Sequence, residues 1–78
     1  MLKVDLALGR WVSRNAYEGG YKEGMGESIG LIYVILGLLD VETNMKGYRD
    51  GRRKMLQENP ELENDPGIQR EREIGLWW

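Results

Sequence analysis

A continuous apolar run occupies the middle of the chain. Residues 29–39 read Ile-Gly-Leu-Ile-Tyr-Val-Ile-Leu-Gly-Leu-Leu, without one charged side chain. The β-branched residues in the run would also suit a buried strand, but no other segment has the alternating pattern of a strand that could pair with it. A lone strand would leave its backbone groups unpaired. The run is therefore predicted to be a helix that begins between residues 21 and 28 and ends near Leu39.

Such a helix has no polar face to present to water. Burying one large apolar side chain is worth about 1.5–3 kcal/mol, whereas a whole domain is stable by only about 5–15 kcal/mol. Leaving one side of the run in water would forgo on the order of 8 kcal/mol. We therefore expect the run to be covered on every side, by its own chain, by a second copy or by another protein.

The segment before the run has the apolar spacing of a helix. Its apolar side chains recur at helical spacing, with charged residues between them, at Val4, Leu8, Trp11, Val12, Ala16, Tyr17, Tyr21, Met25 and Ile29. Gly19 and Gly20 interrupt this pattern, and small-residue pairs are sites where helices kink. We predict a break or kink near residues 18–20.

A further amphipathic helix is predicted after the run, over residues 41–58. Asp40 has a side chain that suits a helix N-cap. The spacing of four and three residues predicts one stripe along the helix: Val41, Met45, Tyr48, Arg52 and Met55. Pro60 ends the helix, because proline disfavours helical backbone in the residue before it. Residues 59–67 are rich in helix breakers and are predicted to be a loop or extended segment, with a short helix over 68–73.

The predicted fold is all-α, a small bundle of three main helices around the apolar central helix. A helical domain over residues 1–58 precedes an irregular acidic C-terminal tail over residues 59–78, which ends in Trp77 and Trp78. Tryptophan is enriched among the anchors of protein interfaces. The pair is therefore predicted to hold the tail either on the protein's own core or on another chain.

A five-residue motif occurs twice, 27 residues apart. Gly20-Tyr21-Lys22-Glu23-Gly24 and Gly47-Tyr48-Arg49-Asp50-Gly51 match in residue type at every position. A glycine inside a helix costs about 0.5–1 kcal/mol relative to alanine, but glycines four residues apart share a face and let a neighbouring backbone approach closely. The motif is therefore predicted to pack helices together, and Gly30 and Gly37, two turns apart, share a face in the same way. The residues assigned to helix packing are Gly20, Tyr21, Gly24, Gly30, Gly37, Gly47, Tyr48 and Gly51.

These two segments resemble the ribosome modulation factor family, whose small bacterial members carry a Gly-Tyr-x-x-Gly helix and a later Gly-aromatic-Arg helix. The matching residues are Gly20, Tyr21 and Gly24, and then Gly47, Tyr48 and Arg49. The resemblance covers about a fifth of the chain and implies association with ribosomes. Between the motifs that family is basic and polar, whereas this chain is apolar there and acidic overall. We interpret the likeness as a convergent packing solution.

Cysteine and histidine are both missing from the 78 residues. The chain therefore has no disulfide, no thiol nucleophile and no imidazole to act as a base or a metal ligand. The acidic residues follow no calcium-loop pattern, and Ser13 and Ser28 have no catalytic context. We expect no catalytic residue, no metal site and no cofactor.

The net charge of −2 hides a segregation of charge along the chain. Residues 41–57 carry a charge of +3 and residues 58–78 a charge of −4, so a basic helix and an acidic tail can pair with each other. The alternative is a nucleic-acid or ribosome contact by the basic helix 46–54. Its candidate residues are Arg49, Arg52, Arg53 and Lys54. The pI of about 5.1 disfavours this alternative, because nucleic-acid-binding domains usually have a pI above about 9.

A membrane role is also disfavoured. The apolar run would rise only about 16 Å as a helix, about half of a bilayer core, and the first eight residues lack the pattern of a secretory signal. The sequence thus favours a cytoplasmic, non-enzymatic interaction module that self-associates, most simply as a two-fold dimer, or binds another protein. A phage or mobile-element accessory or inhibitor protein would have this character. The predicted partner-binding residues are Ile32, Tyr33, Ile35, Leu36, Leu39, Trp77 and Trp78.

Overall fold

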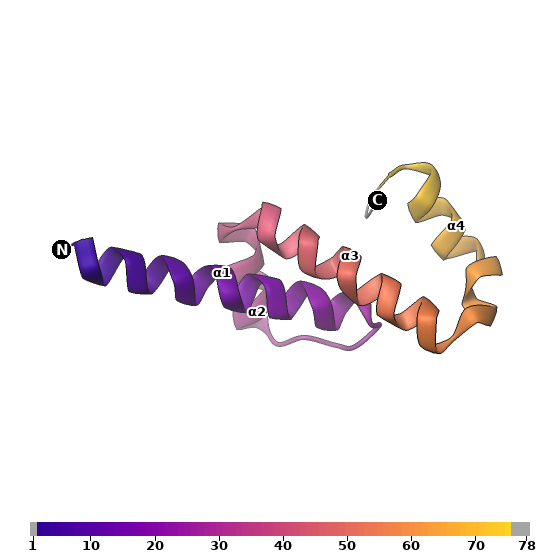
Figure 1. Ribbon diagram of the computed structural model, residues 1–78, viewed down its shortest axis with the longest axis horizontal. Coiled ribbons are helices and arrows are strands. Elements are labelled where there is room, and N and C mark those ends of the chain that lie inside the picture. Colours follow the sequence, from indigo (N-terminus) through magenta and orange to yellow (C-terminus); the bar gives the residue numbers. More distant parts are fainter. Residues whose placement is uncertain (1, 76–78) are drawn as a thin grey trace.

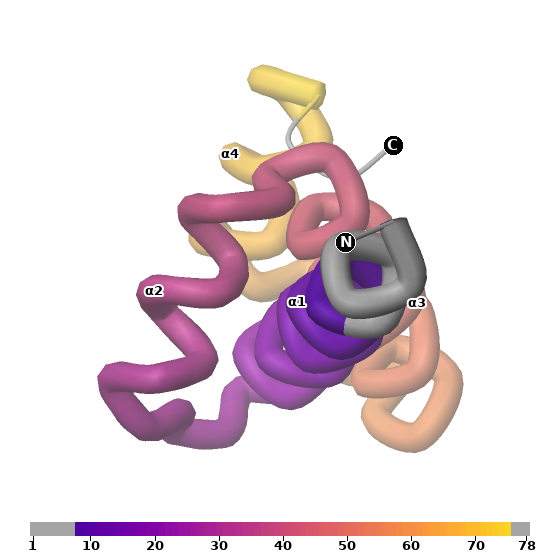
Figure 2. The backbone as a smooth tube through the Cα atoms, turned by 90° about the vertical axis from the view of Figure 1, so that its left-hand side faces the viewer, coloured from indigo at the N-terminus to yellow at the C-terminus, as the bar shows by residue number. Residues whose placement is uncertain are grey.

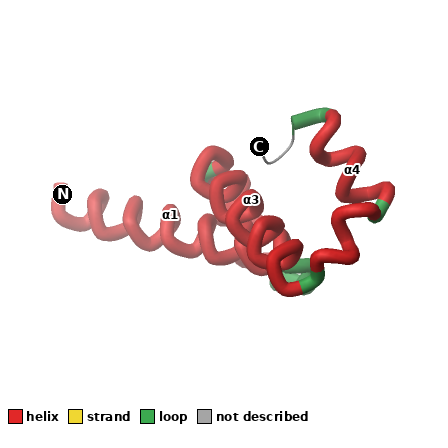
Figure 3. The backbone as a smooth tube through the Cα atoms, turned by 45° about the vertical axis from the view of Figure 1, so that its right-hand side comes forward, coloured by secondary structure: helices red, strands yellow, loops and turns green. Residues whose placement is uncertain are grey.

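The computed structural model describes residues 2–75, and the side chains of residues 8–75. Every element in this part of the chain is helical, which confirms the predicted small all-α bundle (Figure 1). The elements are α1 (Leu2–Gly24), α2 (Leu31–Leu39), α3 (Val41–Glu58), the 3-10 helix η1 (Pro60–Asn64) and α4 (Pro66–Glu73). Short loops connect them (Figure 3).

The helices α1 and α3 form the body of the molecule and run side by side in the same direction (Figure 1). Seen along α1, the short helix α2 lies on one side of this pair, while α4 lies at the far end (Figure 2). α2 is held at its end by Asp40, whose carboxylate accepts hydrogen bonds from the Ser13 hydroxyl at 2.7 Å and from the backbone N–H of Thr43 at 3.3 Å. These bonds lower the pKa of Asp40, because they stabilise its charged form.

The contact between α1 and α3 depends on the four glycines of the repeated motif. A Cβ at Gly20 would lie closer than 3.0 Å to the carbonyl oxygen of Asn44, and one at Gly47 equally close to that of Tyr17. Real Cβ atoms essentially never come so close to a backbone atom. One turn further on, Gly24 lies against the carbonyl of Tyr48, and Gly51 against that of Tyr21. The two backbones therefore touch along the whole motif, as in membrane helix pairs built on glycines spaced by four.

Two predicted boundaries in the first half of the chain are wrong. α1 continues through Gly19 and Gly20 without the predicted break, because both glycines face neighbouring helices and packing stabilises them in helical form. Gly19 lies against the Tyr33 side chain. The apolar helix begins at Leu31, later than predicted, since α1 uses the residues up to Gly24 and Gly26 then turns the chain with a φ of +88°.

The second half follows the prediction more closely. α3 has the predicted bounds, and Asp40 caps it as expected. The predicted loop over 59–67 is wrong in part, because η1 forms there and α4 begins at Pro66. Proline fits the first turn of a helix, where its missing N–H costs nothing, and Asp65 accepts hydrogen bonds from the N–H groups of Gly67 and Ile68.

A small apolar cluster closes this end of the molecule. Met55 and Leu56 of α3 are buried with Ile68 of α4, and Met25, Tyr48 and Leu62 pack against them. The cluster explains why α4 lies against the end of α3. It contains none of the apolar residues of α2.

Candidate interaction surface

The inner side of α2 is defined by three residues. Leu36 is buried, with 4% of its surface exposed. Gly37 lies directly against the Asn44 side chain of α3, and that side chain donates a hydrogen bond to the Ala16 carbonyl of α1 at 2.9 Å. Tyr33 is half-buried against Gly19, with the ammonium group of Lys22 5.0 Å from its ring centre. α2 therefore has one covered side, which faces α1 and α3.

The outer side of α2 is wholly apolar and exposed. Six large side chains point away from the body, with exposed fractions from 43% to 75%. We call them the α2 surface: Leu31, Ile32, Val34, Ile35, Leu38 and Leu39. Soluble monomers rarely expose contiguous apolar patches larger than a few hundred Å², and larger patches usually mark an interaction site. No charged residue lies within α2 to break the surface.

A groove runs along one edge of this surface, between α2, the first turn of α3 and Glu23 of α1. It holds about 250 Å³ and is lined mainly by apolar groups, among them Val34, Leu38 and Val41. Val41 itself is 55% exposed. The α2 surface therefore continues to the first turn of α3.

The structure divides the predicted partner-binding residues into two groups. Ile32, Ile35 and Leu39 lie on the α2 surface, whereas Leu36 and Tyr33 face inward and are occupied by contacts within the chain. Trp77 and Trp78 lie outside the described residues. Leu31, Val34 and Leu38 could not be singled out from the sequence, because a run of apolar residues gives no sign of which side faces the body.

Gly30 differs from the other glycines assigned to helix packing. A Cβ there would meet nothing within 4 Å, and the residue serves as the N-cap of α2. Gly30 therefore makes no close helix contact with any described residue. Gly37 and the four motif glycines do make such contacts.

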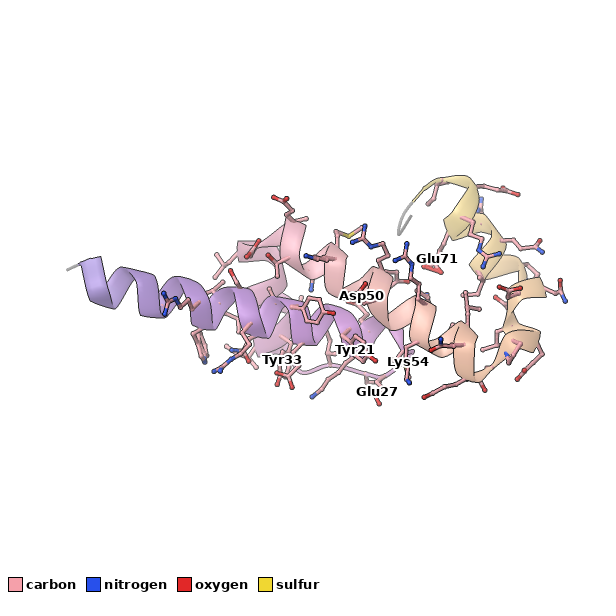
Figure 4. All side chains as sticks on the ribbon, in the orientation of Figure 1. Tyr21, Glu27, Tyr33, Asp50, Lys54 and Glu71 are labelled. Carbon is pink, nitrogen blue, oxygen red and sulfur yellow. The ribbon has the colours of Figure 1, made fainter. Side chains whose placement is uncertain are left out.

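The basic residues of α3 do not form one open patch. Arg52 is used inside the protein: it donates to the Gly24 carbonyl at 3.1 Å and pairs with Glu71 at 3.2 Å. Figure 4 shows Glu71 on the side of α4 that faces α3. Lys54 forms an exposed pair with Glu58, and Arg53 is exposed. The Arg52–Glu71 pair joins the basic helix to the acidic tail.

Two tyrosines lie beside carboxylates in the same region. The Tyr48 hydroxyl donates to Glu71 and accepts a hydrogen bond from Arg52. Burial, together with the bond to Glu71, raises the pKa of Tyr48 to about 12. The Tyr17 hydroxyl donates to Asp50 at 2.5 Å, and this bond raises the pKa of Tyr17 to about 12. Both hydroxyls therefore remain protonated and can donate. Tyr17 links α1 to α3, and Tyr48 links α3 to α4.

The described part of the chain contains no group of three or more acidic residues placed to hold a metal ion. None of its helices has both the length and the apolar character needed to cross a membrane. Comparison with protein-family models, with curated proteins and with solved structures found no match for this chain.

Proposed function

We propose that this protein is a non-enzymatic interaction module that self-associates through the α2 surface, most simply as a two-fold dimer. The observation that supports the proposal is the outward, uncharged and wholly apolar side of α2. The six side chains are on average a little more than half exposed. At about 1.5–3 kcal/mol per fully buried side chain, covering them is worth roughly 5–10 kcal/mol. This free energy is comparable with the whole stability of a small domain.

The absence of charge on α2 favours a second copy as the partner. A charged surface needs a partner of opposite charge, whereas an uncharged apolar surface is compatible with apolar residues of a second copy. In a two-fold interface both subunits use the same patch, so each α2 surface faces residues of the other subunit. Each subunit then covers the surface of the other.

The proposal is tested by the mass of the protein in solution, measured by light scattering. The wild-type protein is expected at twice the 9.0 kDa of the chain, and Leu38→Lys is expected at the mass of one chain. Leu38 is 72% exposed, so this change leaves the body intact, which circular dichroism verifies. Gln57→Lys, on the exposed part of α3, is the matched control and should remain a dimer. A monomeric wild type, or a dimeric Leu38→Lys, would refute the proposal.

A further inference from the structure

Among residues 2–75, no other helix lies beside the first part of α1. We call residues 2–11 the N-terminal arm; Figure 1 shows it projecting beyond α2 and α3. Residues 8–11, a complete helical turn, are all exposed. Within the described residues, a Cβ at Gly9 would meet nothing within 4 Å. A surface that receives these exposed residues would bury apolar area and so stabilise the arm.

The arm carries apolar side chains at helical spacing. Leu8 is 57% exposed and Trp11 is 43% exposed, and the sequence places Val4 one turn before Leu8. These positions form one stripe of the helix. Leu8 and Trp11 therefore lie on an exposed part of α1, before the buried Ala16.

The arm and the α2 surface are matched in character and in length. In the described part of the chain, Leu8 and Trp11 of the arm and the six residues of the α2 surface all expose apolar side chains. At 1.5 Å per residue, the ten residues of the arm span about 15 Å and the nine residues of α2 about 13 Å. The arm does not fold onto its own α2, because α1 is continuous and leads the arm away from α2. A second copy can supply the missing contact to both.

We propose that the N-terminal arm of one copy lies on the α2 surface of a second copy, and that the exchange is reciprocal about a two-fold axis. This inference rests on the proposed self-association and identifies the segment that covers α2. Pairing of α2 with the partner's α2 would cover α2 but leave both arms exposed. Exchange of arms covers both surfaces in one interface.

The available area fits a stable dimer. An aromatic side chain such as Trp11 presents about 150–250 Å², and a fully exposed leucine or isoleucine presents an area of the same order. Leu8, Trp11 and the six residues of the α2 surface are on average a little more than half exposed, so together they present on the order of 800 Å². A standard stable interface uses about 800 Å² from each partner. Arm exchange therefore offers enough area for a stable dimer without any other surface of the protein.

Disulfide trapping tests the inference cleanly, because the chain has no cysteine of its own. Two full-length single variants, Leu8→Cys and Ile35→Cys, are mixed under mild oxidation, with a tag on one that separates the products on a gel. A disulfide needs Cα atoms about 4.4–6.8 Å apart, so each product reports which helices meet. Gln57→Cys, exposed on α3, serves as the control for random collision.

The expected result is a mixed disulfide between Leu8→Cys and Ile35→Cys, formed at least ~10-fold faster than any product of the control, as the effective concentration within a complex requires. If Ile35→Cys links mainly to itself in a dimeric protein, arm exchange is overturned while self-association stands. If no product exceeds the control and the protein is monomeric, both proposals are overturned.

Discussion

Gly20 of α1 and Gly47 of α3 hold equivalent positions in their helices. Each lies against the carbonyl oxygen of the residue three places before the other, Asn44 for Gly20 and Tyr17 for Gly47. The same reciprocity holds one turn later for Gly24 and Gly51. The repeated motif thus becomes a pseudo-two-fold contact between two parallel helices. A five-residue repeat in the sequence corresponds to a local symmetry of the fold.

Replacing Gly47 by alanine should destabilise the protein. Alanine gains up to about 1 kcal/mol of helix propensity, but its Cβ would overlap the Tyr17 carbonyl, and overpacking of this kind costs about 1–3 kcal/mol or more. We expect a net loss in the free energy of unfolding, measured with urea. Gly9→Ala is the control, because a Cβ there meets nothing, and it should stabilise the protein. If both variants gain stability, the close α1–α3 contact does not exist.

Replacing Arg52 by methionine should detach α4. The change removes the pair with Glu71, whose side chain is only 15% exposed, and the bond to the Gly24 carbonyl. Leaving such partly buried groups unsatisfied costs about 1–3 kcal/mol. Hydrogen exchange should then rise in residues 66–73 before it rises in α1 and α3.

The control for Arg52 is Lys54→Met on the same helix. Lys54 pairs with Glu58, but both side chains are about half exposed, and such surface pairs contribute about 0.3–0.5 kcal/mol. Exchange in α4 should therefore be unchanged. An equal response to the two substitutions would show that Arg52 does not link the helices.

Alkaline pH should unfold the protein over a defined range. Tyr17 and Tyr48 have a pKa of about 12 in the folded chain, against 10.0 ordinarily. The folded state keeps both protons where the unfolded state loses them, so their stabilisation is complete below pH 10 and is lost as the pH rises toward about 12. Urea unfolding at a series of pH values should show this decline.

The tyrosinate absorbance identifies the groups responsible. Two ionisations near pH 12 are expected, and Tyr17→Phe and Tyr48→Phe should each remove one of them. Ionisation of either residue near pH 10 in the folded protein would contradict its hydrogen bond to a carboxylate.

The sequence predicts most of the helices because their boundaries have local causes. Asp40 and Pro60 define the two ends of α3 through capping and through the conformation that proline requires. The repeated glycines indicate a helix contact because glycine is costly in a helix unless packing uses it. The all-α fold follows from these features and from the apolar spacing of α1.

Other features could not be predicted, for physical reasons. Gly19 and Gly20 suit either a kink or a close contact, and only their position against Tyr33 and Asn44 decides between these. The orientation of α2 was equally open, because every side of a wholly apolar helix gains from burial. The contacts of Leu36 and Gly37 define its inner side. Leu31, Val34 and Leu38 then become exposed as a consequence.

The dependence of stability on protein concentration tests the central claim, that the α2 surface is covered by association. If folding and association are coupled, the urea midpoint of the unmodified protein rises with concentration, by about 2.7 kcal/mol of stability for a hundredfold increase. We predict that rise, and its loss in Leu38→Lys. A midpoint that stays constant over the same range would show that the folded monomer tolerates the exposed surface, and would contradict the account.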